Sequence, residues 1–194
     1  RKLAGYYKPY KLLFFSDMFC AITGAAVTLA IPLLVRYITQ TVTEMELSEA
    51  MDMILKLGAL MLGLVVIEFL CNYYITYFGH LIGAHIEHDM RNEIFDNYQK
   101  LSFAFFDNQK VGHLLSRITA DLFDISELLH HGPEDLVISA IKLLGAFIIM
   151  GAVNLKLALV AIFFVLVMLV YAVVYNTKMK SAFKENRARI ADIN

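Results

Sequence analysis

Residues 101–121 read LSFAFFDNQKVGHLLSRITAD, and this stretch lies between apolar segments that are long enough to cross a membrane. It contains a group of aromatic residues, a polar turn, a glycine and then a new amphipathic pattern with helical spacing. This order predicts the tip of a long helical hairpin that holds a small docking surface away from the lipid. A membrane protein that exposes such a surface is expected to contact a soluble partner.

The composition is that of an integral membrane protein. Hydrophobic residues make up 59% of the 194 residues, against about 45–50% in soluble domains. A spanning helix needs about 20 mostly apolar residues, and four stretches meet this need: 12–35, 57–78, 136–155 and 157–175. We therefore expect an all-α integral membrane fold with four long transmembrane helices and cytoplasmic extensions.

Lysine and arginine residues predict which side of the membrane each loop faces, because cytoplasmic loops carry an excess of them. Thirteen of these residues lie in residues 1–11, 79–135 and 176–194, and three lie on the opposite side, at Arg36, Lys56 and Lys156. We expect both ends of the chain to be cytoplasmic, in a multi-pass protein of the cell membrane. No basic stripe with interleaved aromatic residues occurs, which excludes nucleic-acid binding as a function class.

The long connection between the second and third spans is predicted to form two helical arms. Apolar residues recur every three or four positions in 79–101 and again in 114–131, as in amphipathic helices. At 1.5 Å per residue the arms would project about 33 and 26 Å. At their tip, Phe103, Phe105 and Phe106 form either a buried staple that closes the two helices or a surface that docks on a partner.

The turn between the arms contains residues that commonly reverse a chain. Asp107 or Asn108 can cap the following helical turn, and Gly112 allows a tight reversal or a close backbone approach. We expect a short transverse helix here.

The run KLSFAFFDNQKVGHLLSRITADLFDI, residues 100–125, resembles the first intracellular loop of ATP-binding-cassette (ABC) exporters of the MsbA-like type. The resemblance rests on Phe105-Phe106-Asp107, Gly112, Leu114-Leu115, Ser116-Arg117 and Asp121. Three further segments resemble parts of the same family. YYKPY at 6–10 is similar to the elbow helix, IPLL at 31–34 to the region of the proline late in the first span, and NLKL at 154–157 to the outer turn after the third span. Together they extend the resemblance along essentially the whole chain.

The resemblance implies a partial transmembrane domain of a six-span exporter subunit. It assigns residues 1–11 to the elbow helix, 79–135 to the first intracellular loop and 176–194 to the cytoplasmic extension of the fourth span. The chain begins with Arg, and we expect it to be an excerpt of a longer protein. Two subunits, alike or different, would move an amphiphilic drug, lipid or peptide by alternating access.

The same resemblance places ATP hydrolysis outside this chain. No GxxxxGK[ST] phosphate-binding loop occurs in the sequence, and no catalytic residue is expected. ATP and Mg²⁺ would bind a carboxy-terminal nucleotide-binding domain, which would push on a coupling segment of this chain: Phe105, Phe106, Asp107, Asn108, Gln109, Lys110, Val111 and Gly112. Ser116, Arg117 and Asp121 would shape the loop, with Arg117 and Asp121 holding its arms together by charge-assisted hydrogen bonds.

Glu68 lies near the middle of the second predicted span. An ionisable residue at that depth is a functional-site hypothesis, here a contact in a substrate cavity. The alternatives are a structural partner for a neighbouring helix and a protonated carboxyl that faces a wet cavity. Two rival functions use the same residues: a stand-alone four-helix scaffold or receptor, and an ion-driven carrier with Glu68 as its proton site. Two further spans and a phosphate-binding loop downstream would distinguish the exporter from both.

The histidines of the arms suggest a metal site only weakly. His85 and His88 are three residues apart, and His130 and His131 are adjacent. Adjacent side chains on a helix point about 100° apart, which suits one metal ion poorly, so we expect no metal site. Gly132-Pro133 is expected to kink its helix.

Overall fold

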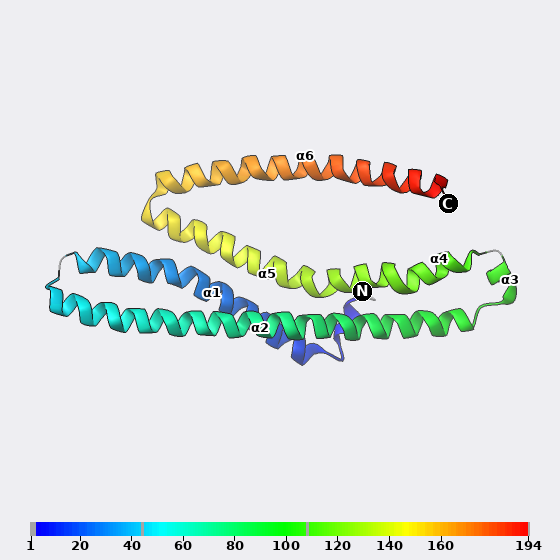
Figure 1. The fold of residues 1–194 in the computed structure, drawn as a ribbon, viewed down its shortest axis with the longest axis horizontal. Coiled ribbons are helices and arrows are strands. Elements are labelled where there is room, and N and C mark those ends of the chain that lie inside the picture. Colours follow the sequence, from blue (N-terminus) through cyan, green and yellow to red (C-terminus); the bar gives the residue numbers. More distant parts are fainter. Residues whose placement is uncertain (1–2, 44, 108, 194) are drawn as a thin grey trace. The chain divides into compact units, whose positions relative to one another are not determined.

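The computed structural model describes residues 3–43, 45–107 and 109–193, and for residues 113, 181 and 184–193 it describes only the backbone. Every element within these residues is helical. Figure 1 shows the elements in chain order, which are a 3₁₀ helix η1 (Leu3–Tyr7), α1 (Lys11–Val42), α2 (Leu47–Gln99), α3 (Phe103–Asp107), α4 (Val111–Ser116), a π-helical turn η2 (Arg117–Asp121), α5 (Leu122–Val153) and α6 (Leu155–Ile193). The expected all-α fold is confirmed.

Four helical stretches of the described chain are long and apolar enough to cross a membrane: Lys11–Val42, Leu47–Gln99, Leu114–Val153 and Leu155–Lys180. They contain the four predicted spans except at one boundary. The third predicted span ran to residue 155, whereas α5 ends at Val153 and α6 begins at Leu155. The turn falls at Asn154 because its side-chain Oδ1 accepts a hydrogen bond from the Leu157 N–H at 3.2 Å and thereby caps α6.

The chain divides into two compact units, residues 1–143 and 144–194. In the second unit, α6 carries uncharged, largely apolar side chains on all sides from residue 157 to 175, as a helix surrounded by lipid or other helices does. The functional features described below all lie in the first unit.

Small residues bring α1 and α2 together. Ala21, Gly24 and Ala25 are buried on α1, and a Cβ added at Gly24 would lie 3.8 Å from the Cys71 Cβ on α2. Small side chains of this kind allow helix backbones to approach closely in membranes. A hydrogen bond between the hydroxyls of Ser16 and Tyr74, 2.7 Å apart, adds a polar contact between the same two helices.

The core of the first unit lies where α2 packs against the beginning of α5. Ile82, Ile86 and Met90 follow the helical period on α2 and are buried together with Leu122 of α5. Burial of each such side chain contributes about 1.5–3 kcal/mol. This cluster makes the predicted arms one packed hairpin, in which α2 runs unbroken to Gln99 and helical backbone returns from Val111.

Three tyrosines attach the amino-terminal elbow to this hairpin. The Tyr6 hydroxyl donates to Glu93, and the Tyr10 hydroxyl donates to Asp89 Oδ2 at 2.9 Å. Asp89 and Glu93 are four residues apart and so share one face of α2. The hydrogen bond to Glu93 is the main reason that the pKa of Tyr6 is raised to about 12. The elbow suggested by YYKPY is therefore a short 3₁₀ helix fixed to α2.

The third tyrosine compensates for a proline. Pro133 lies inside α5 and has no N–H, so it cannot donate to the carbonyl of Leu129 four residues earlier. The Tyr7 hydroxyl donates to this carbonyl instead. α5 is continuous from Leu122 to Val153, so the helix does not end at Gly132-Pro133, where a kink is expected.

Tyr7→Phe is expected to lower the free energy of unfolding by about 1–3 kcal/mol, because it leaves a partly buried carbonyl without a donor. Pro133→Ala restores the backbone N–H, so the same change should be nearly neutral in a Pro133→Ala background. Thermal unfolding of the four proteins of this double-mutant cycle measures the difference. An equal loss in both backgrounds would mean that the Tyr7 hydroxyl stabilises the protein independently of the donor that Pro133 lacks, and no loss in either would mean that Tyr7 contributes only the packing of its ring.

Candidate functional site at the tip of the hairpin

The hairpin tip consists of α3 and the loops on either side of it. After α2 ends, the Leu101 N–H donates to the Tyr98 carbonyl at 3.1 Å, and the Phe105 N–H donates to the Ser102 carbonyl at 3.0 Å. These bonds start α3 directly after the turn. The predicted transverse helix is thus Phe103–Asp107, and the predicted coupling segment 105–112 extends from its last turn across the loop into α4.

The aromatic residues of the tip differ in how far they are buried. Phe105 and Phe106 are half-buried, and their rings meet edge to face with centroids 5.4 Å apart, a favourable arrangement for aromatic pairs. Phe103 is 90% exposed. Phe105 and Phe106 thus pack against each other within the tip, and the exposed aromatic residue is Phe103, two residues before the segment selected from the sequence.

Phe103 lies on the rim of an apolar groove of about 380 Å³. The floor combines the end of α2 with the returning arm, and its lining includes Phe95, Tyr98, Phe106, Leu114 and Ile118. Val111 and Leu115 border it and are well exposed. Apolar patches exposed outside the membrane-spanning segments commonly mark protein interaction sites.

The polar residues of the predicted coupling segment lie in the chain between Phe106 and Val111, which both line the groove. Asp107, Gln109 and Lys110 are exposed, whereas Asn108 lies outside the described residues. The interpretation of Gly112 is wrong in one respect. Gly112 is inside α4, no described glycine has a positive φ, and a Cβ at this position would meet nothing within 4 Å. Neither a tight reversal nor a close approach within this chain requires the glycine.

Arg117 and Asp121 do not hold the arms together. Both are exposed, as is Ser116, and neither forms an ion pair among the described residues. They occupy the π-helical turn η2, in which the backbone hydrogen-bond pattern departs from the α-helical one. Arg91 of α2 makes the link instead, because its Nε donates to the Ile118 carbonyl in this turn at 3.3 Å.

A second bond holds Arg91 in place for this role. Its guanidinium also pairs with Glu87, one turn earlier on α2. Sequence reasoning missed Arg91 because its acceptor is a main-chain carbonyl, which no side-chain pattern reveals.

Glu68 faces α1. Its Oε1 lies 2.7 Å from the Thr28 hydroxyl, and its side chain is half-buried. This hydrogen bond across the helix pair favours the structural interpretation of Glu68. It gives the carboxyl a partner on the neighbouring helix, as buried polar groups in membranes require.

The geometry agrees with comparisons to known proteins. Residues 14–194 match the family described as the ABC transporter transmembrane region. The chain is 40% identical to an uncharacterized ABC transporter ATP-binding protein, YwjA, of Bacillus subtilis over 192 residues, which is 99% of this chain and 33% of that protein.

Two further relatives are more distant. Another uncharacterized ABC transporter ATP-binding protein of Bacillus subtilis, YknU, is 24% identical over all of this chain and 33% of its own length. An ATP-dependent lipid A-core flippase of Idiomarina loihiensis is 32% identical over 66% of this chain and 21% of its own length. The chain spans about a third of the length of the first two. It belongs to the ABC transporter transmembrane family, as a membrane-spanning domain of the exporter type.

Proposed function

We propose that this chain is the transmembrane part of an ATP-driven exporter and that the tip groove receives a nucleotide-binding domain. The observation that carries the proposal is an exposed apolar groove at the end of a hairpin whose two arms share a buried apolar cluster. A hairpin with a buried core and an exposed apolar tip is suited to transmit the movement of a soluble domain to the membrane spans.

Charge supports the orientation that this role needs. Thirteen basic residues lie in the three segments assigned to the cytoplasm. By the excess of basic residues in cytoplasmic loops, they favour an orientation in which the tip lies on the side where ATP is present. The exposed polar residues between the groove residues Phe106 and Val111, namely Asp107, Gln109 and Lys110, would form part of the rim of the interface. Such a rim around an apolar centre is the usual anatomy of protein interfaces.

The nucleotide-binding domain and the second transporter subunit that this function requires would be supplied outside the 194 residues described by this sequence. ATP and Mg²⁺ would bind the nucleotide-binding domain, and closure of two such domains would drive alternating access in a pair of transporter subunits. The apolar side chains of α6 suit contact with lipid, with further spans or with the second subunit. The substrate would be an amphiphile such as a drug, lipid or peptide. The bond from Thr28 to Glu68 gives no support to the ion-driven carrier.

A test uses the complete protein in inside-out vesicles. ATP with Mg²⁺ should drive accumulation of an amphiphilic fluorescent dye, and a non-hydrolysable ATP analogue should not. Movement of the dye that follows an ion gradient without ATP would contradict the proposal and favour the carrier.

Sidedness can be checked in the same vesicles. A cysteine at the exposed tip position Gln109 should react with an impermeant maleimide from the ATP side, whereas a cysteine at the exposed turn position Lys156 should react only after the vesicles are opened. The reverse pattern would place the tip on the wrong side for a nucleotide-binding domain.

A further inference from the structure

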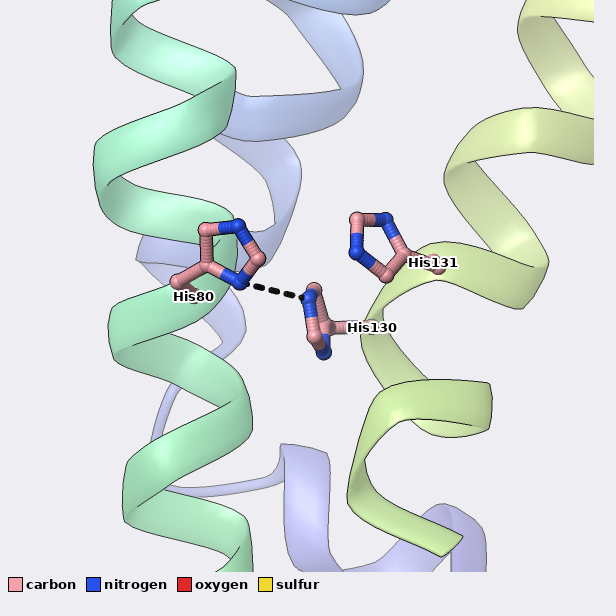
Figure 2. A group of neighbouring side chains, drawn as sticks. All are labelled: His80, His130 and His131. Atoms are coloured by element: carbon pink, nitrogen blue, oxygen red, sulfur yellow. Dashed lines mark hydrogen bonds between the residues drawn. The ribbon is translucent and has the colours of Figure 1, made fainter. Parts of the chain in front are cut away.

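Three histidines from two helices meet inside the hairpin. His80 lies on α2, and His130 and His131 lie on α5; each offers a ring nitrogen, and these atoms lie within 4.8 Å of one another. Figure 2 shows the three rings converging on one space between the two helices. Reasoning from sequence considered only histidines that are neighbours along the chain, and His80 is 50 residues from His130.

The adjacent pair on α5 is not splayed apart. The rings of His130 and His131 have centroids 4.0 Å apart and planes inclined by 37°. The two side chains therefore turn toward each other, although their positions on the helix are about 100° apart. That separation was the reason for expecting no metal site. His80 completes the group, since its Nδ1 lies 3.2 Å from His130 Nε2. Two ligand nitrogens of a tetrahedral zinc ion lie about 3.3 Å apart, given Zn–N bonds of about 2.0–2.1 Å.

An outer partner leaves one ring nitrogen of His130 available. His130 Nδ1 lies 3.1 Å from the Ser126 carbonyl, which can only accept, so Nδ1 carries the proton and Nε2 of the neutral ring keeps its lone pair. Metal-binding histidines almost always make such a bond through their second nitrogen. His131 Nε2 lies 3.7 Å from Glu127 Oε2, too far for a hydrogen bond, so Glu127 contributes a nearby negative charge rather than a bonded partner.

The surroundings favour a dication and give it access. Asp17 and Glu134 are buried beside the histidines, where a Cβ at Gly79 would lie 3.7 Å from Asp17 Oδ1 and 3.5 Å from Glu134 Oε2. Within the described part of the chain, Asp17 Oδ1 is buried without a hydrogen-bond partner. On the other side, His80 is exposed and borders an open hollow of about 440 Å³ lined also by Tyr77 and Leu81.

We propose that His80, His130 and His131 form a binding site for a first-row divalent transition-metal ion, which braces α2 against α5 inside the hairpin. Imidazole ligands suit zinc, copper and nickel better than magnesium or calcium. The ion would connect the outgoing and returning arms between the spans and the tip. This site is independent of the proposed function, since it requires neither ATP nor substrate.

The test uses the full-length protein in detergent, stripped with a chelator and titrated with Zn²⁺ against a chromophoric competitor. One Zn²⁺ per protomer is expected. His80→Ala, a change at an exposed position, should weaken binding by more than about 100-fold. Zn²⁺ should also raise the unfolding temperature of the unmodified protein but not that of His80→Ala.

His88→Ala is the matched control, because His88 is an exposed histidine of the same helix that interacts with Asn92 at 2.9 Å. Its affinity for Zn²⁺ should equal that of the unmodified protein. The proposal is overturned if the unmodified protein binds no Zn²⁺, if His80→Ala binds as tightly as the unmodified protein, or if His88→Ala loses as much affinity as His80→Ala.

Discussion

Phe103→Ala is expected to abolish the stimulation of ATP hydrolysis by substrate in the complete transporter, while basal hydrolysis and membrane insertion persist. Phe103 is 90% exposed, so its removal costs the isolated hairpin little. If docking buries the ring, its loss removes about 1.5–3 kcal/mol, which weakens docking by about 10- to 150-fold. ATPase activity in liposomes, measured with and without substrate, reports the effect together with transport.

Phe123→Ala provides the matched control, because Phe123 is a half-exposed phenylalanine of the returning arm that does not line the groove. It should retain both stimulation and transport. Phe106→Ala is a less selective variant, since Phe106 also packs against Phe105 within the tip. Unchanged stimulation and transport in a well-folded Phe103→Ala protein would remove the groove from the mechanism.

Most of the fold was predictable because it depends on local patterns. Apolar length gave the four spans, and a period of three to four residues gave the two arms. Both signals are contained in a single stretch of sequence. Ile82, Ile86 and Met90 lie in the core where the helical period puts them. The family motif added the position of the tip.

The sequence does not reveal the contacts between helices. Arg91 bonds to a main-chain carbonyl of η2, Tyr7 bonds to the carbonyl that Pro133 leaves without a donor, and His80 meets two histidines of α5. Each contact depends on how two helices are rotated about their axes, which periodicity does not fix. Gly112 shows the opposite error, in which a residue type suggested a turn but the backbone there is helical.

The largest effect on stability is expected at Gly83, where α2 passes closest to a buried side chain of α5. A Cβ at Gly83 would lie 2.6 Å from His130 Nδ1 and 3.1 Å from its Cε1. Relief would require the ring to leave the Ser126 carbonyl, its hydrogen-bond acceptor. Gly83→Val should therefore lower the free energy of unfolding by about 1–3 kcal/mol or more. Gly58→Val on the same helix, where a Cβ meets nothing within 4 Å, should change it by about 0.5 kcal/mol or less.

A second substitution can show that the clash with His130 is the cause. Gly83→Ala gains about 1 kcal/mol of helix propensity, so in a His130→Ala background, where the ring is gone, it should be neutral or stabilising. In the unmodified protein the same change meets the ring and should be destabilising, and a thermal-unfolding cycle measures this reversal of sign. A Gly83→Val protein as stable as Gly58→Val would show that the arms can separate without cost. Arms that separate so easily could not transmit a push from the tip to the spans, so the result bears on the mechanism as well as on the packing.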